Sequence, residues 1–146
     1  MNTREIDNHL LGVESYIGTY ARNRLPAVSM QRPLALVMNT DPDSKAGEHW
    51  ITIYLNVDGT GDYFDSYGLP PLHREVYEFL CDNAPSGVSY NAVTLQNIFS
   101  TTCGGYCVLY IKARSGGVTH CEFINQFSRV NTVNNDKYVS NYIRMY

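Results

Sequence analysis

The sequence HWITIYLNVDGTGDYFDSYG, residues His49–Gly68, has the pattern of a β-hairpin. Its first part, His49–Asn56, is rich in β-branched and aromatic residues and predicts a strand that is covered on both faces. The stretch VDGTG predicts the turn, and Asp62–Gly68 the returning strand. Because the start of one antiparallel strand lies near the end of the next, we expect the side chains of His49 and Asp65 to be neighbours, with Cβ atoms about 4.5–8 Å apart.

The segments around this hairpin predict a domain of the α+β class. An apolar run, Pro33–Asn39, has the length of a strand, and Gly87–Gln96 predicts another. Apolar spacing and capping boxes predict helices at Asn2–Gly12, Leu69–Asn83, Cys103–Arg114, Thr119–Phe127 and Asn134–Tyr146. Strands are thus grouped in the middle with helices at both ends, which favours an α+β fold. With 146 residues and no linker or repeat, the chain is expected to form one domain, residues 1–146.

The composition excludes several classes of protein. Hydrophobic residues make up 44% of the chain and charged residues 17%. No apolar run reaches the roughly 18 residues of a membrane span, and the N-terminus lacks the form of a signal peptide, so we expect an intracellular protein that is neither secreted nor in a membrane. The four cysteines are then expected to be reduced thiols. A formal net charge of −3 with scattered lysine and arginine argues against strong nucleic-acid binding.

A second segment, LQNIFSTTCGGYC at residues Leu95–Cys107, carries a candidate nucleophile. Cys103 stands at the start of a predicted helix, where free N–H groups and the helix dipole stabilise a thiolate. The next residue, Gly104, keeps one side of the thiol open. Gln96, seven residues before Cys103, can direct its amide toward the same oxygen as the backbone N–H of Cys103.

Nucleophilic catalysis by a thiol requires a base, a group that orients the base, and donors for the developing oxyanion. The chain offers His49, Asp65 and Gln96 for these three roles. Each residue also has an ordinary structural explanation: a buried cysteine, a half-buried histidine, a turn aspartate and a polar surface glutamine. Their combination, with each residue at the edge of a predicted element, favours a catalytic site.

Two further assignments stay open. Trp50, beside the histidine, is either a wall of the site or an ordinary core residue. A zinc site is the alternative explanation for the cysteines, but the spacing is unusual for structural zinc. We therefore expect no metal at Cys103, Cys107, His120 and Cys121.

The segments GEHWITIY, DYFDSYG and LQNIFSTTCGGYC resemble the adenovirus protease (adenain) family of cysteine endopeptidases, with the SUMO-specific proteases as more distant relatives. An upstream segment, residues 16–40, is also similar to the adenovirus enzyme. The resemblance implies a central mixed β-sheet flanked by helices, with the catalytic cysteine at a helix N-terminus. It assigns the roles of base, acid, oxyanion donor and nucleophile to His49, Asp65, Gln96 and Cys103. The adenovirus enzyme has glutamate in place of Asp65, whereas the SUMO proteases have aspartate.

The resemblance also implies a reaction and a setting. The reaction is cleavage of viral or virus-like structural precursor proteins at glycine-containing sites through a thioester acyl-enzyme, with Trp50 and Gly104 bordering the substrate. Similar proteases occur in virus-like DNA transposons of the Maverick/Polinton type. No cofactor is expected, and an activating peptide, if there is one, is expected not to be disulfide-linked, because Tyr90 and Asn91 stand where the adenovirus enzyme has its cysteine. We expect a monomer in the host nucleus or cytoplasm, or packaged in virions.

Three alternatives use the same residues. The first is an isopeptidase of the deubiquitinase or deSUMOylase kind, acting on Gly-Gly tails. The second is acyl transfer, as in bacterial effector acetyltransferases of a related fold, but these need a further domain for which 146 residues leave no room. The third is a peptide-binding module without catalysis, which the complete set of four catalytic residue types disfavours.

Overall fold

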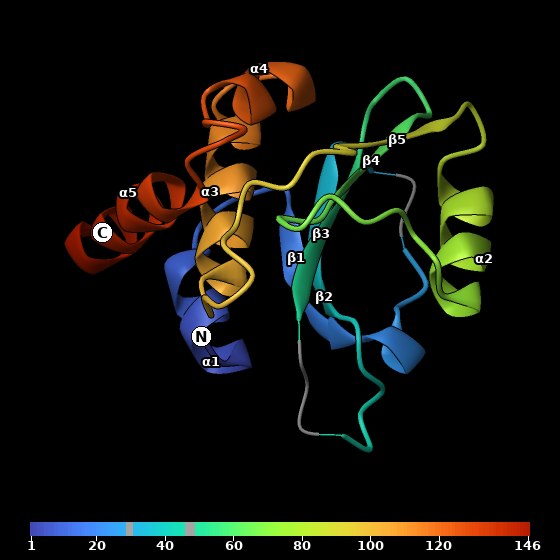
Figure 1. The fold of residues 1–146 in the computed structure, drawn as a ribbon. Helices are drawn as coiled ribbons and strands as arrows, with labels where there is room; N and C mark the ends of the chain where they lie inside the picture. Colours follow the sequence, from blue (N-terminus) through green and yellow to red (C-terminus); the bar gives the residue numbers. More distant parts are fainter. Residues whose placement is uncertain (29–30, 46–48) are drawn as a thin grey trace.

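The computed structural model describes residues 1–28, 31–45 and 49–146. One sheet crosses the molecule in the strand order β1-β2-β3-β4-β5 (Figure 1). Its strands are β1 (Tyr16–Ala21), β2 (Leu34–Asn39), β3 (Trp50–Leu55), β4 (Gly61–Phe64) and β5 (Val88–Tyr90). The two outer pairs of strands are parallel and the two inner pairs are antiparallel. The predicted mixed sheet is therefore confirmed.

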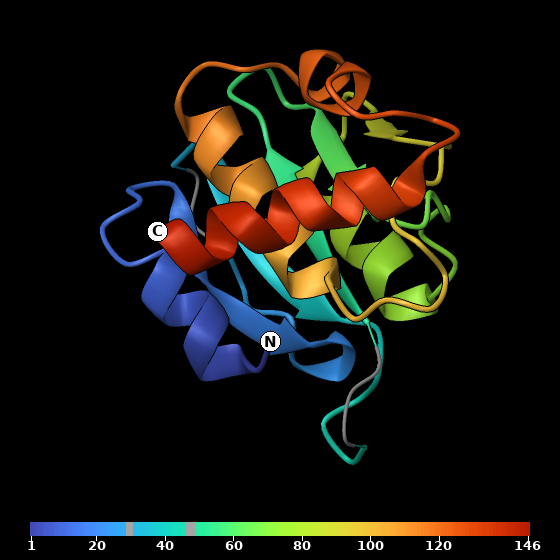
Figure 2. The same ribbon diagram turned by 60° about the vertical axis from the view of Figure 1, so that its left-hand side comes forward.

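Helices cover both faces of this sheet, so the predicted α+β class is confirmed as well. They are α1 (Thr3–His9), α2 (Arg74–Asn83), α3 (Cys103–Ser115), α4 (His120–Asn125) and α5 (Thr132–Met145), with a short 3₁₀ helix η1 (Arg22–Arg24). Helix α2 lies on one face, and α1, α3, α4 and α5 gather on the other (Figure 1). Figure 2 shows α5 lying across α3. Across the described ranges, no helix is long and apolar enough to span a membrane.

Strand β3 is buried on both faces, as its sequence predicts. Ile51, Ile53 and Leu55 are fully buried in a core cluster that includes residues of α2. Tyr54 belongs to the opposite cluster, which includes residues 106–111 of α3, and Trp50 packs against this cluster. Burial of one such side chain contributes about 1.5–3 kcal/mol. The strand therefore fixes the sheet between its two helical layers, and with it the position of the residue directly before the strand.

The segment after β5 differs from the prediction. The sequence predicts a strand over Gly87–Gln96, but only Val88–Tyr90 pairs with the sheet. Asn91 explains the early end, because its side chain bonds both backbone groups of Asp65. Its Oδ1 accepts from the N–H of Asp65 at 3.0 Å, and its Nδ2 donates to the carbonyl of Asp65 at 2.6 Å. The side chain thus takes over the pairing that a further strand residue would make, and the backbone is free to turn toward α3.

The turn after β4 depends on a glycine. The returning strand is predicted to reach Gly68, but β4 ends at Phe64 and the chain then turns, so that the N–H of Gly68 donates to the carbonyl of Asp65 at 2.7 Å. Gly68 has a φ of +75°, and a Cβ at this position would lie 2.6 Å from the backbone of Val93. A larger residue would therefore push on the segment that leads to Cys103.

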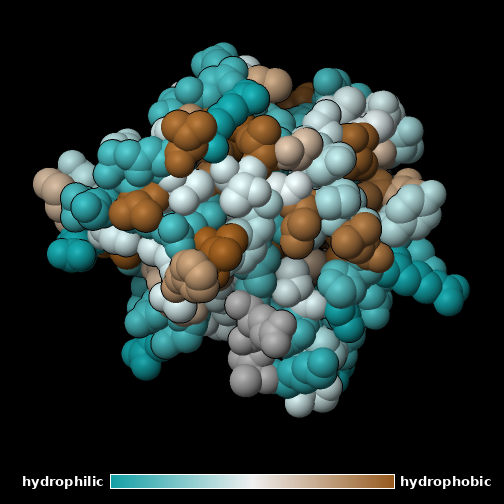
Figure 3. Space-filling view, in the orientation of Figure 1, coloured by the Kyte–Doolittle hydropathy of each residue, from teal (hydrophilic) through white to brown (hydrophobic). Residues whose placement is uncertain are grey.

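Apolar side chains reach the surface in separate patches. On the face drawn in Figure 3, they are divided by polar side chains and do not form one continuous area. Exposed apolar residues scattered in this way are normal on protein surfaces. Among the described residues on this face, no continuous apolar area of the kind that obligate interfaces bury is seen.

We expect Gly68→Ala to lower the free energy of unfolding by about 2–4 kcal/mol, because it combines a positive φ with a backbone clash. Gly12→Ala is the matched control, since φ there is +84° and nothing lies within 4 Å of the added Cβ. The control should cost only about 1 kcal/mol. Urea denaturation of both variants measures the difference, and equal losses would contradict the close approach of Gly68 to Val93.

Candidate active site

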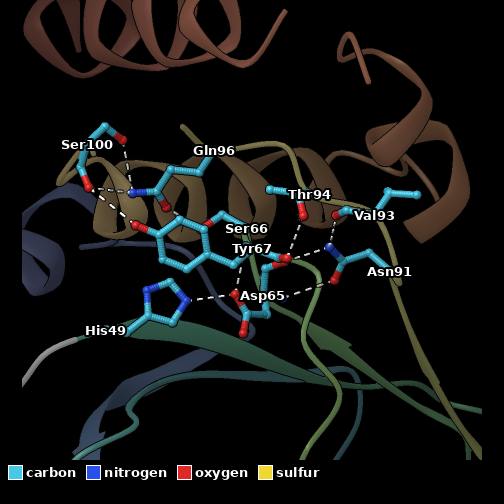
Figure 4. A network of polar contacts seen from close by, with 9 residues as sticks. All are labelled: His49, Asp65, Ser66, Tyr67, Asn91, Val93, Thr94, Gln96 and Ser100. Carbon is cyan, nitrogen blue, oxygen red and sulfur yellow. Dashed lines mark hydrogen bonds and ion pairs between the residues drawn. The ribbon is translucent and has the colours of Figure 1, made fainter. Parts of the chain in front are cut away.

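His49 and Asp65 meet at the open end of the hairpin. His49 lies directly before β3, and Asp65 follows β4. His49 Nε2 and Asp65 Oδ1 are 2.7 Å apart, and the two side chains are only 12% and 3% exposed (Figure 4). The structure thus makes neighbours of these two residues, as the hairpin predicts. With Nε2 bound to the carboxylate, Nδ1 is the ring nitrogen left for another partner.

The Asp65 carboxylate is held by the turn that it begins. Its Oδ1 also accepts from the backbone N–H of Tyr67 at 2.8 Å. The backbone of Asp65 is fixed by Asn91 through the two contacts described above. A carboxylate oxygen that accepts from two donors stays in one orientation, so Asp65 can hold the imidazole in one tautomer.

Tyr67 covers the imidazole from one side. Its ring stacks on that of His49, with ring centroids 4.7 Å apart and an interplanar angle of 27°. Its hydroxyl donates to the carbonyl of Ser100 at 3.4 Å, which ties the ring to the segment before α3 (Figure 4). No motif of the sequence indicated a part in the site for Tyr67. Its position two residues after Asp65, in a turn, is the only signal that the sequence offered for it.

Cys103 is the first residue of α3 and is 7% exposed. Burial by itself would raise the pKa of the thiol. The neighbouring His49, together with the backbone at Trp50 and Gly104, outweighs burial and lowers the thiol pKa below its ordinary value. The sulfur therefore has the surroundings of an activated thiolate.

The imidazole shows the complementary shift. Burial alone would lower the pKa of His49, but the hydrogen bond with Asp65 and the neighbouring Cys103 thiol raise it to about 9. A raised imidazole pKa and a lowered thiol pKa favour the same state, the thiolate–imidazolium pair. Both pKa shifts therefore favour an ion pair between Cys103 and His49.

Gln96 is buried and does not line the cleft at Cys103. It is 1% exposed, and its Oε1 accepts from the hydroxyl of Ser66 at 2.5 Å. Its Nε2 donates to the carbonyl of Ser100 at 3.1 Å and to the hydroxyl of Ser100 at 3.0 Å (Figure 4). Ser100 is thus the residue that faces the site, and the amide of Gln96 is engaged with it.

A cleft of about 320 Å³ opens at Cys103. Its lining includes His49, Trp50, Tyr67, Ser100, Thr101 and Cys103, together with Asn39 and the N-terminal residues Met1, Asn2 and Thr3. The indole N–H of Trp50 donates to the carbonyl of Met1 at 2.9 Å. Trp50 therefore forms part of the wall. A larger cavity of about 670 Å³ lies near the other end of α3, around Lys112 and Arg114, and contains none of the candidate residues.

Gly104 lies against the N-terminal wall. A Cβ there would come within 3.0 Å of Met1 Cβ and 3.3 Å of Trp50 Cδ1. Gly104 is itself buried and does not line the cleft. Because Gly104 has no side chain, Met1 and Trp50 can pack against it and form the wall of the cleft. The sequence does not indicate that Met1 belongs to this wall.

The residues of the zinc alternative are dispersed. Cys107 is buried in the core, and burial raises the pKa of its thiol well above the ordinary value. His120 Nδ1 and the Tyr110 hydroxyl are 2.8 Å apart, and Cys121 is exposed. Among the described residues, no group of three or more histidine, cysteine or acidic side chains could hold a metal ion. The geometry gives no support to the zinc alternative.

The comparisons with known sequences point to viral proteases. No family model matches the chain. It is similar to the SUMO-1 cysteine protease of African swine fever virus (a South African tick isolate) and to the cysteine protease of the Badajoz strain of that virus. In each case it is 31% identical over 101 residues, which cover 61% of this chain and 36% of the viral protein. The chain thus matches about a third of the length of these relatives.

The comparisons with solved structures show the fold. The crystal structure of the African swine fever virus protease matches with a TM-score of 0.65 and 17% identity, over 95% of this chain and 66% of that one. The SUMO protease Ulp1 matches with a TM-score of 0.53 and 10% identity, over 98% and 78%. The central domain of an uncharacterised Legionella pneumophila protein matches with a TM-score of 0.51 and 14% identity, over 99% and 97%. The predicted resemblance to this group of cysteine proteases is confirmed.

We expect the Cys103 thiol to react with iodoacetamide well below the pH at which an ordinary cysteine reacts, about 8.5. His49→Ala removes the interaction that most strongly lowers the thiol pKa, so the midpoint of the pH–rate curve should move upward and the rate at pH 6.5 should fall about tenfold or more. Mass spectrometry of peptides separates Cys103 from the exposed Cys81 and Cys121.

His9→Ala is the control for this measurement, because His9 lies in α1 and takes no part in the cleft lining. Its curve should match that of the unmodified chain. An unchanged midpoint in His49→Ala would mean that His49 does not activate the thiol.

Proposed function

We propose that this chain, which shares the fold of viral and SUMO-specific cysteine proteases, is a cysteine endopeptidase. The observation that carries the proposal is the 2.7 Å contact between His49 and Asp65, beside a thiol whose pKa His49 lowers. The thiol opens on a cleft and begins a helix. A base, a group that orients it and a nucleophile are thus together in one place.

In the proposed reaction Asp65 holds the Nε2 side of the imidazole, so that Nδ1 faces Cys103. The thiolate attacks the carbonyl carbon of the peptide bond, and the electron pair of the carbonyl moves to its oxygen. The intermediate collapses when its C–N bond breaks and the His49 imidazolium gives its proton to the leaving amine. A thioester between Cys103 and the N-terminal part of the substrate remains.

Water completes the reaction. His49, now neutral, takes a proton from water as the oxygen attacks the thioester carbonyl. The C–S bond then breaks, the acid is released and the thiolate–imidazolium pair is restored. The chain needs no cofactor for these steps.

The oxyanion requires donors at the mouth of α3. The backbone N–H of Cys103 belongs to the first turn of the helix, where N–H groups have no partner within the helix. Gln96 is the second donor in this proposal. Because its Nε2 is engaged with the backbone and side chain of Ser100, it has to exchange one of these bonds for the oxyanion when substrate binds.

The substrates proposed are viral or virus-like structural precursor proteins, cut at glycine-containing sites. The small cleft and the approach of Trp50 and Met1 to one another support a substrate with little side-chain volume near the cut. The similarity to a protease of a virus supports the viral setting. Maverick/Polinton-type elements stay a prediction for the source of the chain.

An isopeptidase that acts on Gly-Gly tails is the second candidate. It is favoured by the name of the viral relative, a SUMO-1 cysteine protease, and by the match to the fold of Ulp1. Both candidates use the same thiol and the same cleft, so they differ only in the protein that presents the glycine.

The remaining expectations about partners and location also stay predictions. They are a monomer, no strong nucleic-acid binding, an activating peptide that is not disulfide-linked if one is used, and a location in the host nucleus or cytoplasm or in virions.

We expect the purified chain to cleave peptides that contain Gly-Gly or Gly-X bonds, and Cys103→Ala to abolish cleavage. Mass spectrometry of a peptide library and of a SUMO fusion in parallel distinguishes the two candidates. Cleavage of the library at glycine sites supports the endopeptidase, whereas cleavage of the fusion alone supports the isopeptidase. Binding without cleavage of either would contradict both.

We expect Gln96→Ala to lower kcat about 10²–10³-fold, because it removes one oxyanion donor. Ser100→Ala removes only one of the two groups that hold the Gln96 amide, so its kcat should stay within about threefold of the original. If Ser100→Ala is as damaging as Gln96→Ala, the hydroxyl of Ser100 is the donor and the assignment of Gln96 is wrong.

A further inference from the structure

We propose that Asp136, supported by Asn135, is a positioning residue that holds the segment between β5 and α3 in the shape needed for the reaction. The inference rests on the proposed function, because this segment carries Gln96 and ends at Cys103. Both residues lie in α5, far from the hairpin in the sequence, and neither belongs to the set that the sequence analysis singled out.

Asp136 joins the middle of the irregular segment to its end before α3. It is 8% exposed, and its Oδ2 accepts from the backbone N–H of Asn97 at 3.1 Å. Its Oδ1 accepts from the hydroxyl of Thr102 at 3.2 Å and from the hydroxyl of Tyr106 at 2.8 Å. The carboxylate thus holds the chain directly after Gln96 and again directly before Cys103.

Asn135 holds the chain on the other side of Gln96. Its Nδ2 donates to the carbonyl of Leu95 at 3.0 Å and to that of Ser128 at 2.7 Å. The hydroxyl of Tyr106 reaches the same Leu95 carbonyl at 3.2 Å. The backbone on both sides of Gln96 is therefore bonded to two adjacent residues of α5.

The side-chain hydrogen bonds from α5 take the place of the backbone hydrogen bonds that a strand or helix would make. The chain between β5 and α3 is neither strand nor helix, so its backbone has no ladder of hydrogen bonds. Thr102 is the N-cap residue of α3, yet its side chain caps no backbone N–H of the helix and instead donates to Asp136. A buried carboxylate is costly unless donors surround it, and here three donors do so.

Asp136 contacts residues of the segment that carries the oxyanion donors, but not the residues that lower the pKa of the Cys103 thiol. Its contacts reach Asn97, Thr102 and Tyr106, whereas the thiol pKa is lowered by His49, Trp50 and Gly104. Loss of the carboxylate should therefore disturb the placement of the oxyanion donors and leave the activation of the thiol in place.

The test is Asp136→Asn, which keeps the shape of the side chain but removes its charge and leaves a single oxygen to accept from Asn97, Thr102 and Tyr106. We expect kcat for a cleaved Gly-Gly peptide to fall about 10–100-fold, with KM changed less than about threefold. The pH–rate curve of Cys103 alkylation should stay unchanged. Tyr106→Phe removes one donor but leaves the bond to Asn97, so we expect a smaller loss of kcat.

Val76→Ala is the control for stability, because Val76 is buried under the opposite face of the sheet. A variant that only loses stability should keep its kcat at temperatures where it is folded. If Asp136→Asn keeps its kcat as well, or if its kcat and its alkylation rate fall together, the positioning role is overturned.

Hydrogen exchange gives a readout that does not depend on cleavage. In Asp136→Asn the backbone N–H of Asn97 should exchange at least tenfold faster than in the original chain, while the amides of β3 keep their rates. If the unaltered chain cleaves no substrate, the proposed function fails, and exchange at Asn97 still decides whether Asp136 holds the segment. Unchanged exchange at Asn97 would overturn the inference even in an active enzyme.

Discussion

The buried bond between Asp65 and His49 determines how the rest of the candidate site is arranged. The Asp65 carboxylate is almost completely buried, and hydrogen bonds from His49 and from the N–H of Tyr67 stabilise it there. The backbone of the same residue is fixed by Asn91. Asp65 therefore orients the imidazole, begins the turn after β4 and is the residue that the Asn91 side chain bonds where β5 ends, so the edge of the sheet and the site are linked.

The sequence predicts those parts of the molecule that depend on short-range patterns. The hairpin follows from β-branched residues around a glycine turn, and its register brings His49 and Asp65 together. The start of α3 follows from local pattern in the same way. The roles proposed for these residues rest on the resemblance and on the geometry together.

The rest depends on contacts that no local pattern contains. The predicted strand over Gly87–Gln96 is too long because the Asn91 side chain, and not a further strand residue, bonds Asp65. The stacking of Tyr67, the approach of Met1 and the bonds of Asp136 join residues of different elements. Such contacts are set by how the helices pack on the sheet, which a single sequence does not display.

The composition of the cleft has a consequence for folding. Its walls come from the first three residues of the chain, from the sheet at Asn39 and Trp50, from Tyr67 and from the start of α3. Contacts between such distant positions form late, after the entropy of closing long loops has been lost. In a partly folded chain, the Cys103 sulfur and the His49 imidazole would be present, but the cleft that admits a polypeptide would not yet have formed. If the chain has the proposed protease activity, it would stay latent, and harmless to itself and its neighbours, until its own tertiary structure is complete.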